Sequence, residues 1–134
     1  MTAAVTLGIM AAVTVMPGAG IRAEAAGAVG QGIDVSSYQG VINWQAVKNS
    51  GVTFAFVRVG TSQTIDKQYI NNLQGAAAAG IRTGVYFYTY ATTPEQAANE
   101  AALVLQLIAP YQVSFPVAID IEAQTQAALP PQQL

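Results

Sequence analysis

The chain has 134 residues, of which 52% are hydrophobic and only 9% charged, and its formal net charge at pH 7 is −2. This length suits one ordinary domain, and so weak a charge offers no electrostatic surface for nucleic acid or an anionic membrane. The sequence contains no Cys and no His, which excludes disulfides, thiolate nucleophiles, Ser-His-Asp triads and zinc sites built on imidazole or thiolate. Catalysis would therefore depend on Asp, Glu, Tyr, Lys or Arg.

The first 26 residues have the pattern of an export signal. An apolar run over residues 3–16 is broken by Pro17 and Gly18, and Ala23 and Ala25 are small residues of the kind that signal peptidase recognises. The run is shorter than the roughly 20 residues that span a bilayer. No Lys or Arg precedes it, so a start upstream of Met1 and a buried N-terminal helix both stay open. We expect residues 1–26 to be a signal peptide and the mature chain to be secreted or cell-wall associated, with no membrane span.

The mature part alternates predicted strands and helices joined by short connections. Strands rich in Val, Ile, Phe or Tyr are expected over residues 32–36, 52–59, 81–90 and 115–122. The helices between them, with their capping and stopping residues, are expected to run from Asn43 to Lys48, from Asp66 to Gly80, and from Thr93-Pro94 to Pro110. The apolar face of the last helix should consist of Ala97, Ala101, Val104, Leu105 and Ile108.

This alternation is typical of an α/β fold in which helices cover a parallel sheet whose strands are buried on both faces. Closed barrels of this kind use eight strands, and open doubly wound sheets use about five or six. With four strands predicted, the domain looks unfinished in either case.

Polar side chains gather where the predicted strands end, which is where parallel α/β folds place their chemistry. Asp34 ends the first strand, Arg58 the second, and Asp120 and Glu122 the fourth. Because side chains alternate along a strand, Asp120 and Glu122 share one face, with Cβ atoms roughly 6 to 7 Å apart. Asp34 could instead be a turn residue, and Arg58 could simply pair with an acid. Two like charges on one strand face are harder to explain structurally, since repulsion and lost solvation raise the pKa of at least one.

Tyr86, Tyr88 and Tyr90 share one face of the third predicted strand. Carboxylates beside such an aromatic-lined pocket, without another type of nucleophile, favour glycoside cleavage. That reaction needs one protonated acid to assist the leaving oxygen and a second group to stabilise positive charge at the anomeric carbon. The same Asp-x-Glu pair could hold Mg²⁺ or Ca²⁺ through its oxygens, so a metal-dependent α/β hydrolase that uses Asp34, Asp120 and Glu122 stays open.

Four blocks of the sequence resemble glycoside hydrolase family 25, the secreted lysozymes or muramidases of the Chalaropsis type. The blocks are Gly32–Gly40, Phe56–Gly60, Gly84–Tyr88 and Pro116–Glu122. The resemblance implies a modified TIM-type (β/α) barrel, here truncated after its fourth strand, with residues 27–134 forming part of the catalytic domain. It also implies hydrolysis of the β-1,4 bond between N-acetylmuramic acid and N-acetylglucosamine in peptidoglycan, without a cofactor or metal.

The same resemblance implies roles for individual residues. Glu122 matches the proton donor, Asp120 the carboxylate that orients the substrate N-acetyl group or stabilises charge, and Asp34 the acid that ends the first strand. The residues expected to contact the glycan strands are Tyr86, Arg58 and Tyr38. Because family members continue through further strands, we expect this chain alone to be inactive or very weak. A peptidoglycan-binding module without chemistry is the remaining alternative.

Overall fold

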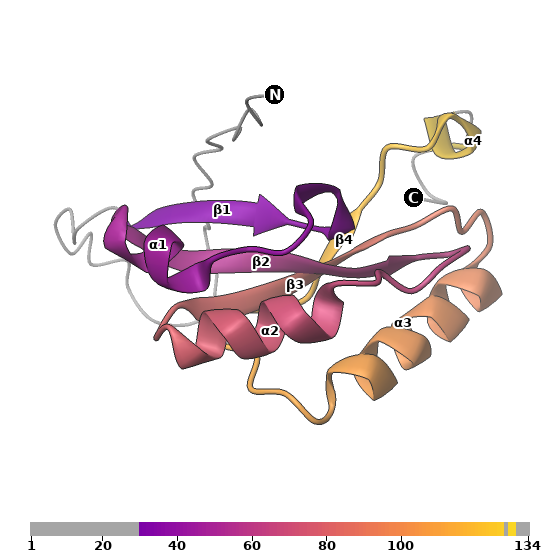
Figure 1. Ribbon diagram of the computed structural model, residues 1–134. Helices are drawn as coiled ribbons and strands as arrows, with labels where there is room; N and C mark the ends of the chain where they lie inside the picture. Colours follow the sequence, from indigo (N-terminus) through magenta and orange to yellow (C-terminus); the bar gives the residue numbers. More distant parts are fainter. Residues whose placement is uncertain (1–29, 128, 131–134) are drawn as a thin grey trace, which may run out of the picture.

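The computed structural model describes residues 30–127 and 129–130, so the predicted signal peptide lies outside the described residues. Within them, four strands form one parallel sheet in the order β1-β2-β3-β4 (Figure 1). The strands are β1 (Gln31–Val35), β2 (Val52–Thr61), β3 (Arg82–Tyr88) and β4 (Ala118–Asp120). The predicted strand order along the chain and the parallel pairing are confirmed.

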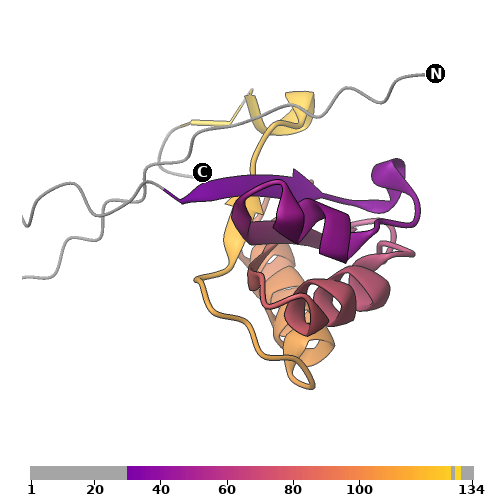
Figure 2. The ribbon, with the colours of Figure 1, turned by 60° about the vertical axis from the view of Figure 1, so that its left-hand side comes forward.

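Three helices cover one side of the sheet, and their starts follow the capping signals of the sequence. They are α1 (Trp44–Asn49), α2 (Tyr69–Ala78) and α3 (Pro94–Ile108), and Figure 2 shows them together beneath the strands. The side chain of Asn43 accepts a hydrogen bond from Ala46 N–H at 3.0 Å, and Thr93 accepts one from Gln96 N–H at 3.3 Å. These bonds satisfy amide groups that a helix start leaves without a partner. Two short helices, η1 (Ser37–Gln39) and α4 (Gln124–Ala127), lie near the carboxyl ends of strands (Figure 1).

The apolar core lies between the sheet and these helices. Alternate residues of β2 and β3 point into it and are almost fully buried, among them Ala55, Val57, Val59, Val85 and Phe87. Trp44, Leu73, Ala76 and Val104 cover them from the helices.

The prediction that the strands are buried on both faces is wrong for this sheet. On the face opposite the helices, Phe54 and Phe56 are only half-buried. The Phe115 ring stacks on Phe56 with a centroid distance of 5.9 Å. Gly32 and Gly84 leave room for these rings, because a Cβ on either residue would lie within 2.5 Å of Phe54 or Phe56 ring carbons.

The fourth strand is shorter than the predicted 115–122. Only Ala118, Ile119 and Asp120 pair with β3, opposite Tyr86, Phe87 and Tyr88. Phe115 packs with the aromatic rings, and Pro116 has no N–H to donate to a ladder. Glu122 therefore lies just beyond the strand.

Two predictions about the helices also need correction. Asp66 does not cap α2, because the residue at that position is Gln68, whose side chain makes no capping bond. On α3 the buried side contains Val104, with Leu103 and Ile108 packed against the core, whereas Ala97, Ala101 and Leu105 of the predicted apolar face are exposed.

Candidate active site

Three of the predicted acids line one cavity at the carboxyl ends of the strands. Asp34 comes from β1, Asp120 from the end of β4, and Glu122 from the segment after it. The cavity measures about 300 Å³ and is completed by Phe56, Tyr86, Ala118 and Ile119. Asp34 and Glu122 are exposed, and Asp120 is half-buried. The structure thus brings together residues that are up to 88 positions apart in the chain (122 − 34).

Asp120 and Glu122 interact directly. Burial raises the pKa of Asp120, and the charge of Glu122, a hydrogen bond between the two carboxyl groups and the charge of Asp34 raise it further. Arg58 opposes this pKa shift. Because the neighbouring acids add to the raised pKa of Asp120, two adjacent ionised carboxylates are unfavourable at this place. Such a pair can supply an acid and a carboxylate at the same place.

Tyr86 forms the wall between the strands that bear these acids. It is the register partner of Ala118 on β4 and of Arg58 on β2. Burial raises the pKa of its hydroxyl to about 12, with Arg58 lowering and Asp34 and Asp120 raising that pKa. Its hydroxyl therefore keeps its proton at neutral pH and can donate a hydrogen bond into the cavity.

Arg58 and Tyr38, predicted to contact substrate, do not line this cavity. The Arg58 guanidinium binds Asp66, with Nη2 2.9 Å and Nε 3.0 Å from Oδ2. The Cζ atom of Arg58 lies 4.9 Å from the centre of the Tyr38 ring, and Tyr38 is 86% exposed. Arg58 thus pairs with an acid, as the sequence allowed, but this acid is Asp66 rather than one of the three that line the cavity.

Asp66 is a structural residue whose role the sequence did not indicate. Its carboxylate also accepts hydrogen bonds from the backbone N–H groups of Ser37 and Gln68, both at 2.9 Å. Burial alone would raise its pKa, but the bonds from Ser37, Gln68 and Arg58 outweigh burial and hold the pKa below its usual value. Asp66 thereby joins η1, β2 and the start of α2.

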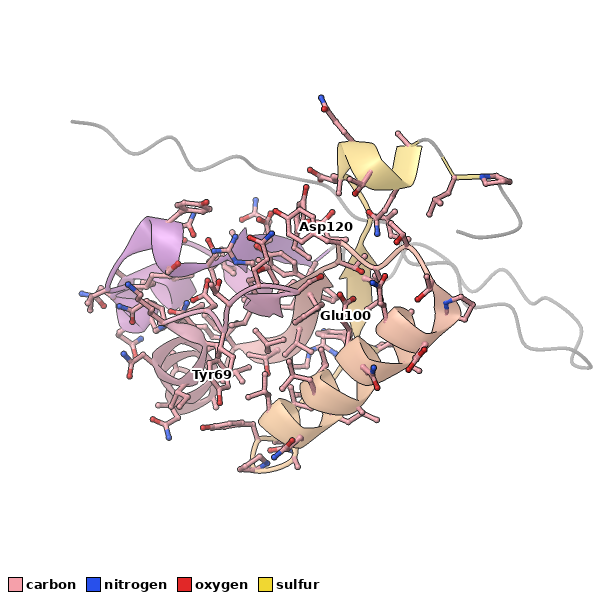
Figure 3. The ribbon with its side chains drawn as sticks, turned by 90° about the vertical axis from the view of Figure 1, so that its right-hand side faces the viewer. Tyr69, Glu100 and Asp120 are labelled. Atoms are coloured by element: carbon pink, nitrogen blue, oxygen red, sulfur yellow. The ribbon has the colours of Figure 1, made fainter. Side chains whose placement is uncertain are left out.

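Glu100 joins a second set of strand ends. Figure 3 shows it on the side of α3 that faces the sheet. Its carboxylate accepts hydrogen bonds from Ser62 and Thr89. The backbone N–H of Thr89 in turn donates to the carbonyl of Asp120 at 3.1 Å. Ser62 lies 38 positions from Glu100 in the chain, so no local pattern could have predicted this connection.

The described residues contain no group of three or more Asp, Glu, Cys or His side chains placed to hold a metal ion. The geometry therefore gives no support to the metal-dependent alternative. Nor does any helix within residues 30–127 have the length and apolar character needed to cross a membrane.

Comparison with known proteins finds one family. Glycosyl hydrolases family 25 matches residues 33–132. Lysozyme M1 of Streptomyces globisporus is 43% identical over 60 residues, which are 43% of this chain and 20% of that protein. The autolytic lysozyme of Clostridium acetobutylicum is 33% identical over 93 residues, 69% of this chain and 28% of that protein.

The chain also resembles solved structures. The modular autolysin LytC of Streptococcus pneumoniae, in complex with a synthetic peptidoglycan ligand, superposes with a TM-score of 0.63 at 33% identity. The superposition covers 68% of this chain and 22% of LytC. The chain thus spans less than a third of the length of each of these relatives.

Proposed function

Because this chain belongs to family 25 of the glycosyl hydrolases, we propose that it carries the catalytic carboxyl groups of a lysozyme active site. The substrate is the β-1,4 bond between N-acetylmuramic acid and N-acetylglucosamine in peptidoglycan. One observation carries the proposal: Asp34, Asp120 and Glu122 line a single cavity at the carboxyl ends of the strands. The names of the two lysozymes and the ligand of LytC agree with this substrate.

The proposed architecture is part of a TIM-type (β/α) barrel. The four parallel strands, with helices on one face only, are the arrangement of half such a barrel. In this arrangement the opposite face, which carries Phe54 and Phe56, would point toward the barrel interior. Residues 1–26 would direct export, and residues 27–134 would form the catalytic portion.

In the proposed mechanism the proton comes from the Asp120–Glu122 pair. Glu122 is the more exposed partner and donates the proton to the leaving glycosidic oxygen. Ionised Asp120 stabilises the positive charge that develops at the anomeric carbon as its bond to the leaving oxygen breaks, or orients the N-acetyl group; water then adds to this carbon and returns a proton to Glu122. Asp34 adds negative charge from across the cavity, and the neutral Tyr86 hydroxyl positions the sugar.

The test is Glu122→Gln, which keeps the shape of the side chain but removes the acidic proton that it would donate. Purified chain is incubated at high concentration with peptidoglycan, and the released fragments are identified by mass spectrometry through their new reducing N-acetylmuramic acid ends. We expect slow release by the unaltered chain and at least about a 100-fold decrease in the variant, since a general acid contributes about 10²–10⁴ in rate. Glycan binding should be retained.

Glu95→Gln is the matched control, because Glu95 is exposed in the first turn of α3. It should leave release unchanged. Equal release by the Glu122 variant would place the proton donor elsewhere. Binding without any release, both by the unaltered chain and by a chimera that adds the further strands of a family 25 relative, would identify a peptidoglycan-binding module instead.

A further inference from the structure

A second cavity opens beside the acidic one, at the carboxyl end of β2. It measures about 330 Å³, and its wall includes Ser37, Arg58, Thr61, Thr64 and Lys67. We propose that this cavity binds a carboxylate of the stem peptide carried by N-acetylmuramic acid. The inference rests on the proposed function, because it assigns a part of the same substrate to a second site.

The two cavities are neighbours across one pair of strands. Arg58 lines the second cavity and Tyr86 the first, and these residues are direct register partners on β2 and β3. The charge of Arg58 also lowers the pKa of both Tyr86 and Asp120 in the first cavity. A substituent on a sugar in the first cavity therefore has the second cavity next to it.

The two cavities differ in charge. The first contains only acids among its charged side chains, Asp34, Asp120 and Glu122. In the second, Arg58 and Lys67 face the single acid Asp66. Asp66 is already neutralised by Arg58 and by two backbone N–H groups. Lys67 takes part in no ion pair within the described residues, so its positive charge is left for a ligand.

Hydroxyl groups add donors to this positive site. The Thr61 hydroxyl oxygen accepts bonds from the N–H groups of Gln63 and Thr64, both at 3.1 Å. Its own hydrogen is therefore directed away from those amides. Thr64 also borders the cavity and carries a second hydroxyl. A carboxylate is an acceptor-only group that two hydroxyls and an ammonium can bind together.

The substrate has a matching division of charge. Its sugars are neutral, and its stem peptide is anionic through the free carboxylates of its amino acids. The three acids would repel an anionic stem from the first cavity, and the adjacent basic cavity attracts it. Lys67 would thus favour stem-bearing peptidoglycan over an uncharged glycan of the same length.

The test compares three ligands on the full chain by calorimetry and by two-dimensional NMR. They are a disaccharide dipeptide of peptidoglycan with free carboxylates, the same compound with its carboxylates amidated, and a trimer of N-acetylglucosamine. The free acid should bind up to about fivefold more tightly than the amide, as for an exposed ion pair. This advantage should shrink in high salt, and the amide signals of Thr61, Thr64 and Lys67 should shift only with the acid.

Lys67→Ala should remove that advantage and leave binding of the amidated compound and of the trimer unchanged, and Lys67→Arg should retain it. Lys48→Ala is the matched control, because the Lys48 ammonium binds the carbonyl of Gly80, away from both cavities. If acid and amide bind equally to the unaltered chain while the trimer still binds, the inference is wrong and the proposed function stands. If none of the three ligands binds, the proposed function itself fails.

Discussion

At the scale of single residues, the candidate site depends on a carboxyl pair that is costly to keep in a folded protein. Asp120 is half-buried and next to Glu122, with Asp34 across the same cavity. Burial comes first among the causes that raise its pKa, and the two neighbouring acids add to it. Ionised Asp120 therefore opposes folding, and such a cost is typical of residues kept for chemistry rather than stability.

Asp120→Asn should make the fold more stable at neutral pH. The unfolded chain ionises Asp120 near its usual pKa, whereas the folded chain ionises it at a higher pH, so the stability present below the usual pKa is lost as pH rises through the raised value. Asparagine removes that loss and can still bond to Glu122. We expect Tm at pH 7 to rise by about 2–5 °C, the scale of one stabilising substitution in a domain of this size.

The gain in Tm from Asp120→Asn should disappear near pH 3, where Asp120 is protonated in both the folded and the unfolded chain. Thermal unfolding followed by circular dichroism at pH 3, 5 and 7 measures this dependence. Glu95→Gln serves as control and should lower Tm slightly, because it removes a charge that favours the α3 dipole. A gain from Asp120→Asn that is equal at pH 3 and pH 7 would show that packing, not ionisation, is responsible.

At the scale of elements, Asp66 fixes the ends of η1, β2 and α2 against one another. One buried carboxylate accepts bonds from Ser37 N–H, Gln68 N–H and the Arg58 guanidinium. These elements carry Tyr38 and much of the wall of the second cavity, the one that contains Arg58 and Lys67. The network therefore holds the loops that border the site without lying in the acidic cavity itself.

Asp66→Ala should destabilise the fold by about 3 kcal/mol, because it leaves Arg58 largely buried without its partner. Since the native pKa of Asp66 is lowered, its contribution is present above the usual pKa and is lost as pH falls through the lowered value. Urea unfolding at pH 7 and pH 3 measures both effects, and the difference between variant and unaltered chain should be smaller at pH 3. If Asp66→Ala lowered the free energy of unfolding by less than about 1 kcal/mol at pH 7, the network around Asp66 would not be important for stability.

The elements show what sequence patterns can and cannot predict here. Asn43 and Thr93 act on amides three residues away, so local chemistry predicted the starts of α1 and α3 correctly. Alternation along the fourth strand predicted that Asp120 and Glu122 would point the same way, and both line the cavity although β4 ends at Asp120. Asp66 was misassigned because its partners Ser37 and Arg58 lie 29 and 8 positions away. The length of β4 depended on where the Phe115 ring packs, which is again a contact between distant residues.

At the scale of the whole molecule, the sheet within the described residues has β1 and β4 as its two edges. Ile119 in β4 is 50% exposed, and Ile121, which follows the strand, is 49% exposed. An apolar edge with unpaired backbone groups is a template for pairing with another chain. We expect this edge, rather than the helix-covered core, to limit the solubility of the chain.

Ile121→Lys should therefore reduce self-association while leaving the fold intact. Ile121 does not line either cavity and is half-exposed, so the substitution should change the free energy of unfolding by about 0.5 kcal/mol or less. Light scattering across a concentration series measures the association.

Leu105→Lys is the control, because Leu105 is 62% exposed on α3 and away from the edge strand. Both variants change the net charge of the chain from −2 to −1, and moving net charge toward zero by itself favours association. A decrease in association confined to Ile121→Lys would therefore come from blocking the edge, whereas an equal decrease in both variants would show that exposed apolar surface of any kind drives it.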